Sequence, residues 1–370
     1  MFEPVYQITN GLLANLLSFE KARAVVEIVP VPGEWEGRLK LDCLTRRVYS
    51  SLRLYGNAIS SPDIGRIVSD EPGRDEKADE VAKRLGLIAS ERDLQMVLNF
   101  LNANKYKEQL GYLSMRFKQT GFGENDLTQL NSLMLEKMIP AKGLGVFRIE
   151  DTGEKLLRGR VVSPLAVEVS YQLEDFFSWF LSSDEGVINP VLKAGVCLYE
   201  IARIQPFDEA SLLTGMLFTN LFMVSAGLDL RGYLVLEEEL LKNKEVLLTR
   251  MKLPEEVGED LTAWLEYFTN SLSEAGAKVK ARLMSIVGEK PMFRSESGKA
   301  IPLTERQIAV MEELTLRGET TIKEIRTILP SVSEDTVLRD LKDLIDKKLV
   351  KKKGRTRGAR YQLGKVRYLR

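Results

Sequence analysis

The chain has 370 residues, of which 44% are hydrophobic and 29% are charged, with 53 basic and 53 acidic side chains and no histidine. This length and composition predict a folded protein of two or three domains with sizeable cores, and exclude a disordered or low-complexity chain. The absence of histidine excludes Ser-His-Asp and Cys-His nucleophile relays, His-ligated zinc sites and a histidine general base.

The cysteines and the apolar segments limit the class of protein further. Cys43 and Cys197 stand alone, without the CxxC spacing of a metal knuckle or a redox pair, so we expect two buried, reduced thiols. The N-terminus has no basic segment followed by an apolar one, and the longest apolar stretch, near Met216 to Leu228, is interrupted by polar residues. The sequence therefore predicts a cytoplasmic protein without a leader and without membrane contact.

The charge is distributed unevenly along the chain. Residues 304–370 hold 17 Lys and Arg against 10 Asp and Glu, whereas residues 1–303 hold 36 against 43, so the two parts carry net charges of +7 and −7. Opposite signs of this kind indicate two modules.

Helical periodicity dominates residues 1–285. We expect a helix capped by Thr9 or Asn10, a second from about Leu41 to Leu54 and, after a charged loop at 69–80, a third that begins at Ser90. Further helices are predicted at 164–179, 190–204, 207–226 and around 261–268. Between them, residues 143–164 contain two short alternating runs on either side of 151–153, the pattern of a β-hairpin.

The C-terminal region has a different pattern. A linker is expected at residues 286–303, followed by three short helices with caps at Thr304, Thr321 and Ser333. Two strands joined by a Gly/Arg tip follow in the segment LVKKKGRTRGARYQL. Three short helices and a basic hairpin are typical of a winged helix-turn-helix domain.

One segment resembles the core motif of a known family. Residues 205–216, QPFDEASLLTGM, resemble the HPFx(D/E)GNGRxxR motif of the Fic (Fido) family. The positions that match are Pro206, Phe207, Glu209, Thr214 and Gly215. The positions that depart are Gln205 for the histidine, Ala210, Ser211 and Leu212 for the Gly-Asn-Gly loop, and Leu213 and Met216 for the two arginines.

Two further stretches resemble the same family. Gly145 to Arg148 resembles its G-x-(F/Y)-R entry into a flap hairpin, and Ser51, Tyr55 and Gly56 resemble its inhibitory helix motif, (S/T)xxxE(G/N), with Tyr55 in place of the glutamate. The resemblance implies a mainly α-helical Fic-type bundle with a small β-hairpin flap, and makes a homodimer an expectation. The domains predicted are an N-terminal helical region with the vestigial inhibitory motif at 1–110, a degenerate Fic core at 111–285, the linker at 286–303 and the winged helix-turn-helix at 304–370.

The departures from the motif remove the chemistry of the family. In active relatives the histidine takes a proton from a target hydroxyl as that oxygen attacks the α-phosphate of a nucleotide, and the amide of Gln205 has no suitable pKa for this step. The loop and the arginines hold the phosphates, and both are replaced here. We therefore predict no catalytic residue, no metal and no cofactor, with Gln205, Pro206, Phe207, Glu209, Ser211 and Leu213 as a vestigial motif.

Two alternatives stay open for this segment. Glu209 alone is a poor magnesium site, because it is one carboxylate without phosphate anchors. The competing hypothesis is a protein adenylyltransferase that transfers AMP to protein hydroxyls by an altered mechanism. The simpler interpretation is that Leu212, Leu213 and Met216 continue an apolar helix into the core.

The C-terminal module predicts DNA as a partner. Its candidate phosphate contacts are Lys351, Lys352, Lys353, Arg355, Arg357 and Arg360, and its candidate base contacts are Ser333, Thr336 and Arg339. The outward face of the third helix also holds Asp335, Asp343 and Asp346, which would repel phosphates. Protein contact or dimerisation through this domain is therefore the alternative.

Taken with the degenerate motif, these features favour a DNA-binding transcriptional regulator or scaffold. A small ligand or peptide at the vestigial pocket is a further expected partner, which would bias the DNA module.

Overall fold

The structure is a computed structural model that describes residues 2–31, 33–117, 121–151, 153–154, 156–157, 161–182, 188–242, 244–256, 258–288, 293–294, 300–301, 303–329, 332–354 and 359–364. The chain divides into two compact units, Met1–Leu283 and Met284–Arg370.

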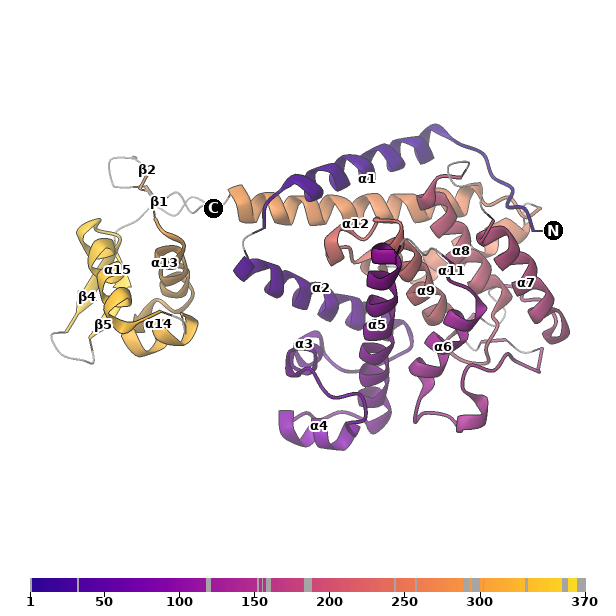
Figure 1. The fold of residues 1–370 in the computed structure, drawn as a ribbon, viewed down its shortest axis with the longest axis horizontal. Helices are drawn as coiled ribbons and strands as arrows, with labels where there is room; N and C mark the ends of the chain where they lie inside the picture. Colours follow the sequence, from indigo (N-terminus) through magenta and orange to yellow (C-terminus); the bar gives the residue numbers. More distant parts are fainter. Residues whose placement is uncertain are drawn as a thin grey trace. The chain divides into compact units, whose positions relative to one another are not determined.

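The first unit is built from helices, which Figure 1 shows from indigo to orange along the chain. They are α1 (Asn10–Ile28), α2 (Gly33–Leu54), α3 (Ser61–Asp70), α4 (Ala78–Leu85), α5 (Glu91–Phe117), α6 (Glu124–Leu135), α7 (Val169–Phe180), α8 (Pro190–Ile204), α9 (Ser211–Ser225), α10 (Leu236–Leu240), α11 (Lys244–Glu256) and α12 (Thr262–Gly288). Short 3₁₀ turns lie at Ala141–Gly143, Ala166–Glu168 and Leu230–Gly232.

Helix α9 forms the centre of this unit. Every residue from Ser211 to Val224 is buried, which the nearly continuous apolar sequence of this helix predicts. α9 packs against α8, α5 and α6. The approach of α5 depends on Gly111, because a Cβ there would lie 2.6 Å from a methyl carbon of Val224.

Helix α1 lies along the long helix α12 (Figure 1). Thr9 caps α1, as expected, and its hydroxyl also donates to Glu266 on α12 at 2.5 Å. Asn15 donates to the backbone oxygen of Glu266 at 3.3 Å. The indole of Trp264 on α12 donates to the backbone oxygen of Gly195 on α8 at 2.8 Å. The first and last helices of this unit, α1 and α12, are therefore held together by hydrogen bonds.

Several predicted elements are confirmed, with shifted boundaries. The Ser90 hydroxyl accepts from the Asp93 N–H at 3.0 Å at the start of α5, and α8 has the expected bounds. α2 begins at Gly33 instead of Leu41, and α9 begins at Ser211 instead of Phe207. The sequence did not predict α3, α4, α6, α10 and α11. Cys43 and Cys197 are free and buried, as expected.

The predicted β-hairpin at 143–164 is wrong for the residues that the structure describes there, none of which lies in a strand. The backbone N–H of Arg148 donates to the oxygen of Pro206 at 2.9 Å, so it pairs with the motif segment instead of a second strand. Gly145 and Gly153 adopt positive φ angles of 65° and 57°, which interrupt extended backbone.

The second unit contains three helices and a small sheet. The helices are α13 (Glu305–Arg317), α14 (Ile322–Ile328) and α15 (Glu334–Asp346), and Thr304, Thr321 and Ser333 cap them as predicted. The strands β3 (Glu319–Thr321), β4 (Val350–Lys353) and β5 (Arg360–Leu363) form an antiparallel sheet in the order β3-β5-β4. The sequence predicted the β4–β5 pair but not β3. Val310, Leu314, Val337, Leu341 and Tyr361 are among its buried core.

The segment expected to be a linker holds two further strands. β1 (Phe293–Arg294) and β2 (Ala300–Ile301) pair antiparallel, Phe293 opposite Ile301.

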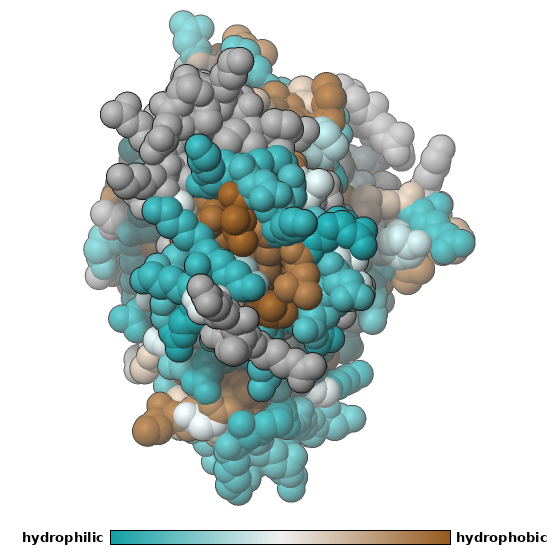
Figure 2. Space-filling model, turned by 90° about the vertical axis from the view of Figure 1, so that its left-hand side faces the viewer, coloured by the Kyte–Doolittle hydropathy of each residue, from teal (hydrophilic) through white to brown (hydrophobic). Residues whose placement is uncertain are grey.

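The face in Figure 2 shows hydrophilic residues around one hydrophobic area near its centre. None of the described helices combines the length and the hydrophobicity of a membrane-spanning segment.

Candidate functional site

The motif segment 205–210 forms the turn between α8 and α9. Gln205 and Ala210 adopt left-handed backbone conformations with φ angles of 47° and 61°, so the turn begins and ends with residues that leave the helical conformation. The Ser211 hydroxyl accepts from the Phe207 N–H at 3.0 Å and donates to the Phe207 oxygen at 2.9 Å. The ring of Phe207 packs against Phe147, with centroids 5.7 Å apart. Ser211 and Phe147 therefore hold Phe207 in the turn.

Gln205, which stands at the family's histidine position, is inside the protein. Its side chain is 1% exposed, and its Oε1 accepts a hydrogen bond of 2.9 Å from the backbone N–H of Glu154. Gly153 has a φ angle of 57°, which favours glycine, and a Cβ there would lie 2.5 Å from this Oε1, so a larger residue would displace the Gln205 amide. Gln205 thus holds the backbone of residues 153–154 against the turn.

Arg148 is a buried structural cation. Its Nε donates to the backbone oxygen of Gln205 at 2.7 Å, and Nη2 donates to the oxygens of Pro164 at 2.6 Å and Ile204 at 3.3 Å. Nη1 donates to the oxygen of Glu150 at 3.0 Å. Burial lowers the pKa of this guanidinium. Because its donors bind the carbonyls at the end of α8, Arg148 fixes the segment that the sequence predicted as a flap to the motif turn.

The start of α9 is occupied by two side chains from elsewhere in the chain. The Leu212 N–H donates to Oε2 of Glu154 at 3.0 Å, and the Leu213 N–H donates to the hydroxyl of Tyr55 at 3.2 Å. Glu154 is 2% exposed and also interacts with the Ala210 N–H and with the hydroxyl of Tyr55. Free N–H groups at a helix start attract anions. Here a carboxyl group of the same chain takes that place.

Burial changes the proton affinities of both groups. It raises the pKa of Glu154 above its ordinary value of 4.5, and the nearby Glu209 raises it further, while the Tyr55 hydroxyl and the N–H groups of α9 oppose the shift. The pKa of Tyr55 is raised by burial and by the adjacent Glu154. Tyr55 therefore keeps its proton next to the carboxyl group of Glu154.

A cleft of about 890 Å³ opens next to this arrangement. It brings together several motif positions that the sequence analysis singled out, namely Tyr55, Gly56, Glu209 and Leu213. Its charged lining residues are mainly acidic: Asp93, Glu150, Glu154, Asp208 and Glu209, against Arg92 and Lys244. Ser51 is not part of this lining and is 1% exposed.

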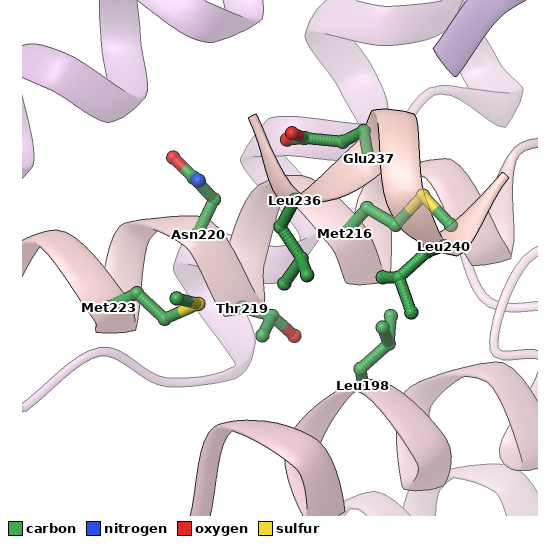
Figure 3. Close-up of a pocket in the computed structure, with 8 residues that line it drawn as sticks. All are labelled: Leu198, Met216, Thr219, Asn220, Met223, Leu236, Glu237 and Leu240. Atoms are coloured by element: carbon green, nitrogen blue, oxygen red, sulfur yellow. The ribbon is translucent and has the colours of Figure 1, made fainter. Parts of the chain in front are cut away.

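The two arginine positions of the family motif are apolar and inside the core. Leu213 is 1% and Met216 is 4% exposed. Met216 lines a small apolar cavity with Leu198, Leu236 and Leu240 (Figure 3). Glu209, by contrast, is exposed. No group of three Cys, Asp or Glu side chains within the described part of the chain has the geometry of a metal site.

Sequence reasoning missed Glu154. It lies between Gly153 and Lys155 in a stretch that also contains Glu150 and Asp151, and no motif distinguishes it from these neighbours. Only the path of the chain, which brings residue 154 to the start of α9, assigns it a place in the site.

The second candidate site lies on the C-terminal unit. Lys351, Lys352 and Lys353 on β4 are exposed, and Arg360 on β5 is exposed and forms an ion pair with Glu319. Arg355 and Arg357 lie outside the described residues. On α15, Arg339 is exposed, whereas the hydroxyls of Ser333 and Thr336 lie 2.9 Å apart and Ser333 caps the helix.

The acidic residues of α15 differ in their environment. Asp343 accepts from Lys347 and from Gln307, both at 2.6 Å, so its charge is partly neutralised. These contacts lower the pKa of Asp343, with the Lys347 hydrogen bond contributing most. Asp335 and Asp346 are exposed.

Comparison with known proteins identifies the fold. The family model Fic/DOC matches residues 121–223. A search of curated proteins found no match. A Fic family protein from Desulfovibrio desulfuricans G20 is similar in structure, with a TM-score of 0.66, 16% identity and coverage of 98% of this chain and 99% of that one.

Two other solved structures are similar over about three quarters of this chain. Fic-1 from C. elegans has a TM-score of 0.54 and 16% identity, with coverage of 74% of this chain and 71% of that one. A Fic domain-containing signaling protein from Bacteroides thetaiotaomicron VPI-5482 has a TM-score of 0.50 and 15% identity, with coverage of 76% and 99%. The chain thus has the helical fold of Fic family proteins and carries a Fic/DOC family domain at residues 121–223.

Proposed function

We propose that this protein is a catalytically inactive Fic-fold protein that acts as a DNA-binding regulator or scaffold through a winged helix in its C-terminal unit. The observation that carries the first half of the proposal is the carboxyl group of Glu154 at the start of α9, on the N–H of Leu212 at 3.0 Å. That helix start is the phosphate-binding position of the family motif.

A nucleotide does not fit the residues present at this position. Its phosphates would have to displace Glu154 in a cleft lined by five acidic residues, Glu154 included, and two basic ones. Leu213 and Met216 offer no cation to hold them, and both are buried. Gln205 uses its acceptor atom on the backbone of Glu154 and has no group that could take a proton from a hydroxyl.

DNA binding is supported by the surface of β4 and by the order of the elements. Three consecutive lysines, Lys351 to Lys353, are exposed on this strand, in a region with a net charge of +7. Helix α15 precedes the strand and presents Arg339 to solvent. Lysines on a hairpin next to a helix-turn-helix suit the phosphates that flank a groove.

Incubation with α-labelled ATP and magnesium tests the first half of the proposal. We expect no label on the protein itself or on added protein substrates, and none for Gln205→His, because a base alone does not restore the phosphate anchors. Incorporation by the wild type that is lost in Glu209→Ala would overturn the proposal in favour of an adenylyltransferase with an altered mechanism.

Fluorescence anisotropy of a labelled duplex tests the second half. Binding is expected at low salt, with an affinity that falls as salt rises. The variant Lys351→Ala/Lys352→Ala/Lys353→Ala should weaken binding and reduce the slope of log affinity against log salt by about one for each phosphate that the variant no longer neutralises. Lys323→Ala, an exposed lysine on α14, is the matched control. Equal affinities for the wild type and the triple variant would favour a protein partner for this unit.

A further inference from the structure

A second cleft, of about 900 Å³, lies between α2, α5, α9 and the segment 227–232, and does not include the motif. It contains a buried lysine that the Fic-type site does not use. Lys107 on α5 is 2% exposed and is among the lining residues. A buried ammonium group is costly unless it is paired, so its environment indicates what this cleft accommodates.

The hydrogen-bond acceptor of the buried Lys107 is a neutral amide. Its Nζ donates to Oδ1 of Asn220 on α9 at 2.7 Å, and it forms no ion pair within the described residues. The nearby Arg47 on α2 has a partner: its Nε lies 3.3 Å from Oε1 of Glu237, and its Nη2 donates to the Leu234 oxygen at 2.6 Å. Figure 3 shows the polar ends of Asn220 and Glu237 on the same side of the apolar cavity below them. Glu237 is thus engaged with Arg47. Among the described residues Lys107 donates to a neutral acceptor, while Glu108, Glu237 and Asp229 act on it through their charges without forming an ion pair.

A second buried polar atom of the same cleft is unsatisfied. Asn104, one turn before Lys107 on α5, is 1% exposed, and its Nδ2 donates to Glu108 at 2.9 Å. Its Oδ1 is buried and has no hydrogen-bond partner in the part of the chain that the structure describes. Within the described residues the cleft therefore offers a lysine without an ion-pair partner and, on the same side of α5, an acceptor without a donor.

The remaining lining contains both apolar and charged side chains. The apolar side chains are Leu41, Leu44, Val68, Leu101, Met115, Val224 and Leu230. The charged side chains carry both signs, with Glu27, Glu36, Glu71 and Asp229 against Arg23, Lys40, Lys105 and Arg231. This mixture of charges does not favour a dianion, whereas the apolar side chains favour a hydrophobic body.

We propose that this cleft binds a small amphipathic carboxylate, with the carboxylate on Lys107 Nζ, the apolar body on the leucine-rich wall, and a hydroxyl donating to Oδ1 of Asn104. The carboxylate supplies the counter-charge that Lys107 lacks. The site is separate from the Fic-type cleft and does not depend on the function proposed above.

Proton uptake gives this proposal a specific signature. Burial and the charge of Arg47 lower the pKa of Lys107 from 10.5 to about 7, although Glu108, Glu237 and Asp229 act in the opposite direction. Most of the protein therefore holds a neutral amine at pH 8. A bound carboxylate favours the ammonium form, so binding at this pH should take up about one proton per ligand.

Isothermal titration calorimetry of the full chain with salicylate, benzoate, octanoate and salicylamide tests the site. Salicylate has the carboxylate, the adjacent hydroxyl and an apolar ring, benzoate lacks the hydroxyl, octanoate has an aliphatic body, and salicylamide lacks the charge. We expect salicylate to bind more tightly than benzoate, and salicylamide to bind about tenfold more weakly or not at all. Titrations at pH 8 in buffers of different ionisation enthalpy should show proton uptake.

Two variants locate the binding site. Lys107→Met keeps the length of the side chain and should weaken salicylate binding about tenfold or more and abolish proton uptake. Leu41→Trp fills the cleft from a position that is 37% exposed, so it tests the site even where Lys107→Met does not fold. Lys83→Met, on the exposed face of α4, is the control for loss of a lysine charge. Failure of all three carboxylates to bind, equal binding of salicylamide, or unchanged binding in folded Lys107→Met and Leu41→Trp would each overturn the proposal.

Discussion

The side-chain oxygen of Gln205 accepts a hydrogen bond of 2.9 Å from the backbone N–H of Glu154. One residue of the motif thereby positions the carboxyl group that lies on the start of α9. The two residues are 51 positions apart in the sequence. Together they place a side chain of the protein on the N–H groups at the start of that helix, where an anion could otherwise bind.

The contact predicts a stability cost for Gln205→Ala. This change leaves the buried N–H of Glu154 without an acceptor, so we expect the free energy of unfolding to fall by about 2 kcal/mol. Urea denaturation followed by circular dichroism measures it. Glu209→Ala, on the exposed part of the same turn, should change it by less than about 0.5 kcal/mol. An equal effect of both substitutions would contradict the role assigned to Gln205.

Glu154→Gln should change how stability depends on pH. The pKa of Glu154 is raised in the folded state above the ordinary 4.5, so the folded protein binds this proton more tightly than the unfolded chain. Its contribution is fully present below pH 4.5 and is lost as the pH rises through the folded pKa. The glutamine does not titrate, so the stability of the variant relative to the wild type should increase as the pH rises above 4.5.

Urea midpoints at several pH values measure this difference, with Glu209→Gln as the control on the same turn. A difference between wild type and Glu154→Gln that stays constant with pH would show that Glu154 does not carry a raised pKa.

Lys107→Met should also reduce the pH dependence of the free energy of unfolding, here in the alkaline range. The pKa of Lys107 is about 7 in the folded protein and 10.5 in its ordinary state, so the unfolded chain binds this proton more tightly. The free energy of unfolding should therefore rise as the pH increases from about 7 towards 10.5. In Lys107→Met this rise should be smaller.

The measurement is a series of urea midpoints at pH 6, 7.5 and 9 without added carboxylate. Lys83→Met provides the comparison, since its amine is exposed on α4. Parallel pH profiles for wild type and Lys107→Met would argue against a neutral amine in the cleft.

Ser333→Ala should destabilise the C-terminal unit. The Ser333 hydroxyl accepts from the Thr336 N–H at the start of α15, and loss of such a cap costs about 1 kcal/mol. Ser333→Asp keeps an acceptor and should retain most of the stability. Differential scanning calorimetry of the full chain can follow this unit, and an unchanged transition in Ser333→Ala would mean that the cap contributes little.

Local patterns were enough to predict much of the fold. Apolar spacing and capping residues predicted α1, α5, α8 and the three helices of the C-terminal unit, because these signals act within one or two turns of chain. The departures of residues 205–216 from the family motif were likewise readable from the sequence. Short helices such as α3, α4 and α10 were missed because packing against the bundle stabilises them more than their own sequences do.

The sequence by itself determined which chemical groups stand in the motif: an amide in place of an imidazole at Gln205, and apolar side chains at Leu213 and Met216. Only the tertiary structure decided what occupies the start of α9, because Glu154 and Tyr55 reach it from segments 58 and 158 residues away. The same is true of Lys107, whose environment is formed by α2, α5, α9 and α10 together. The burial of a side chain and its hydrogen-bond partners depend on which segments meet in space, and the local periodicity of the sequence does not predict which segments meet.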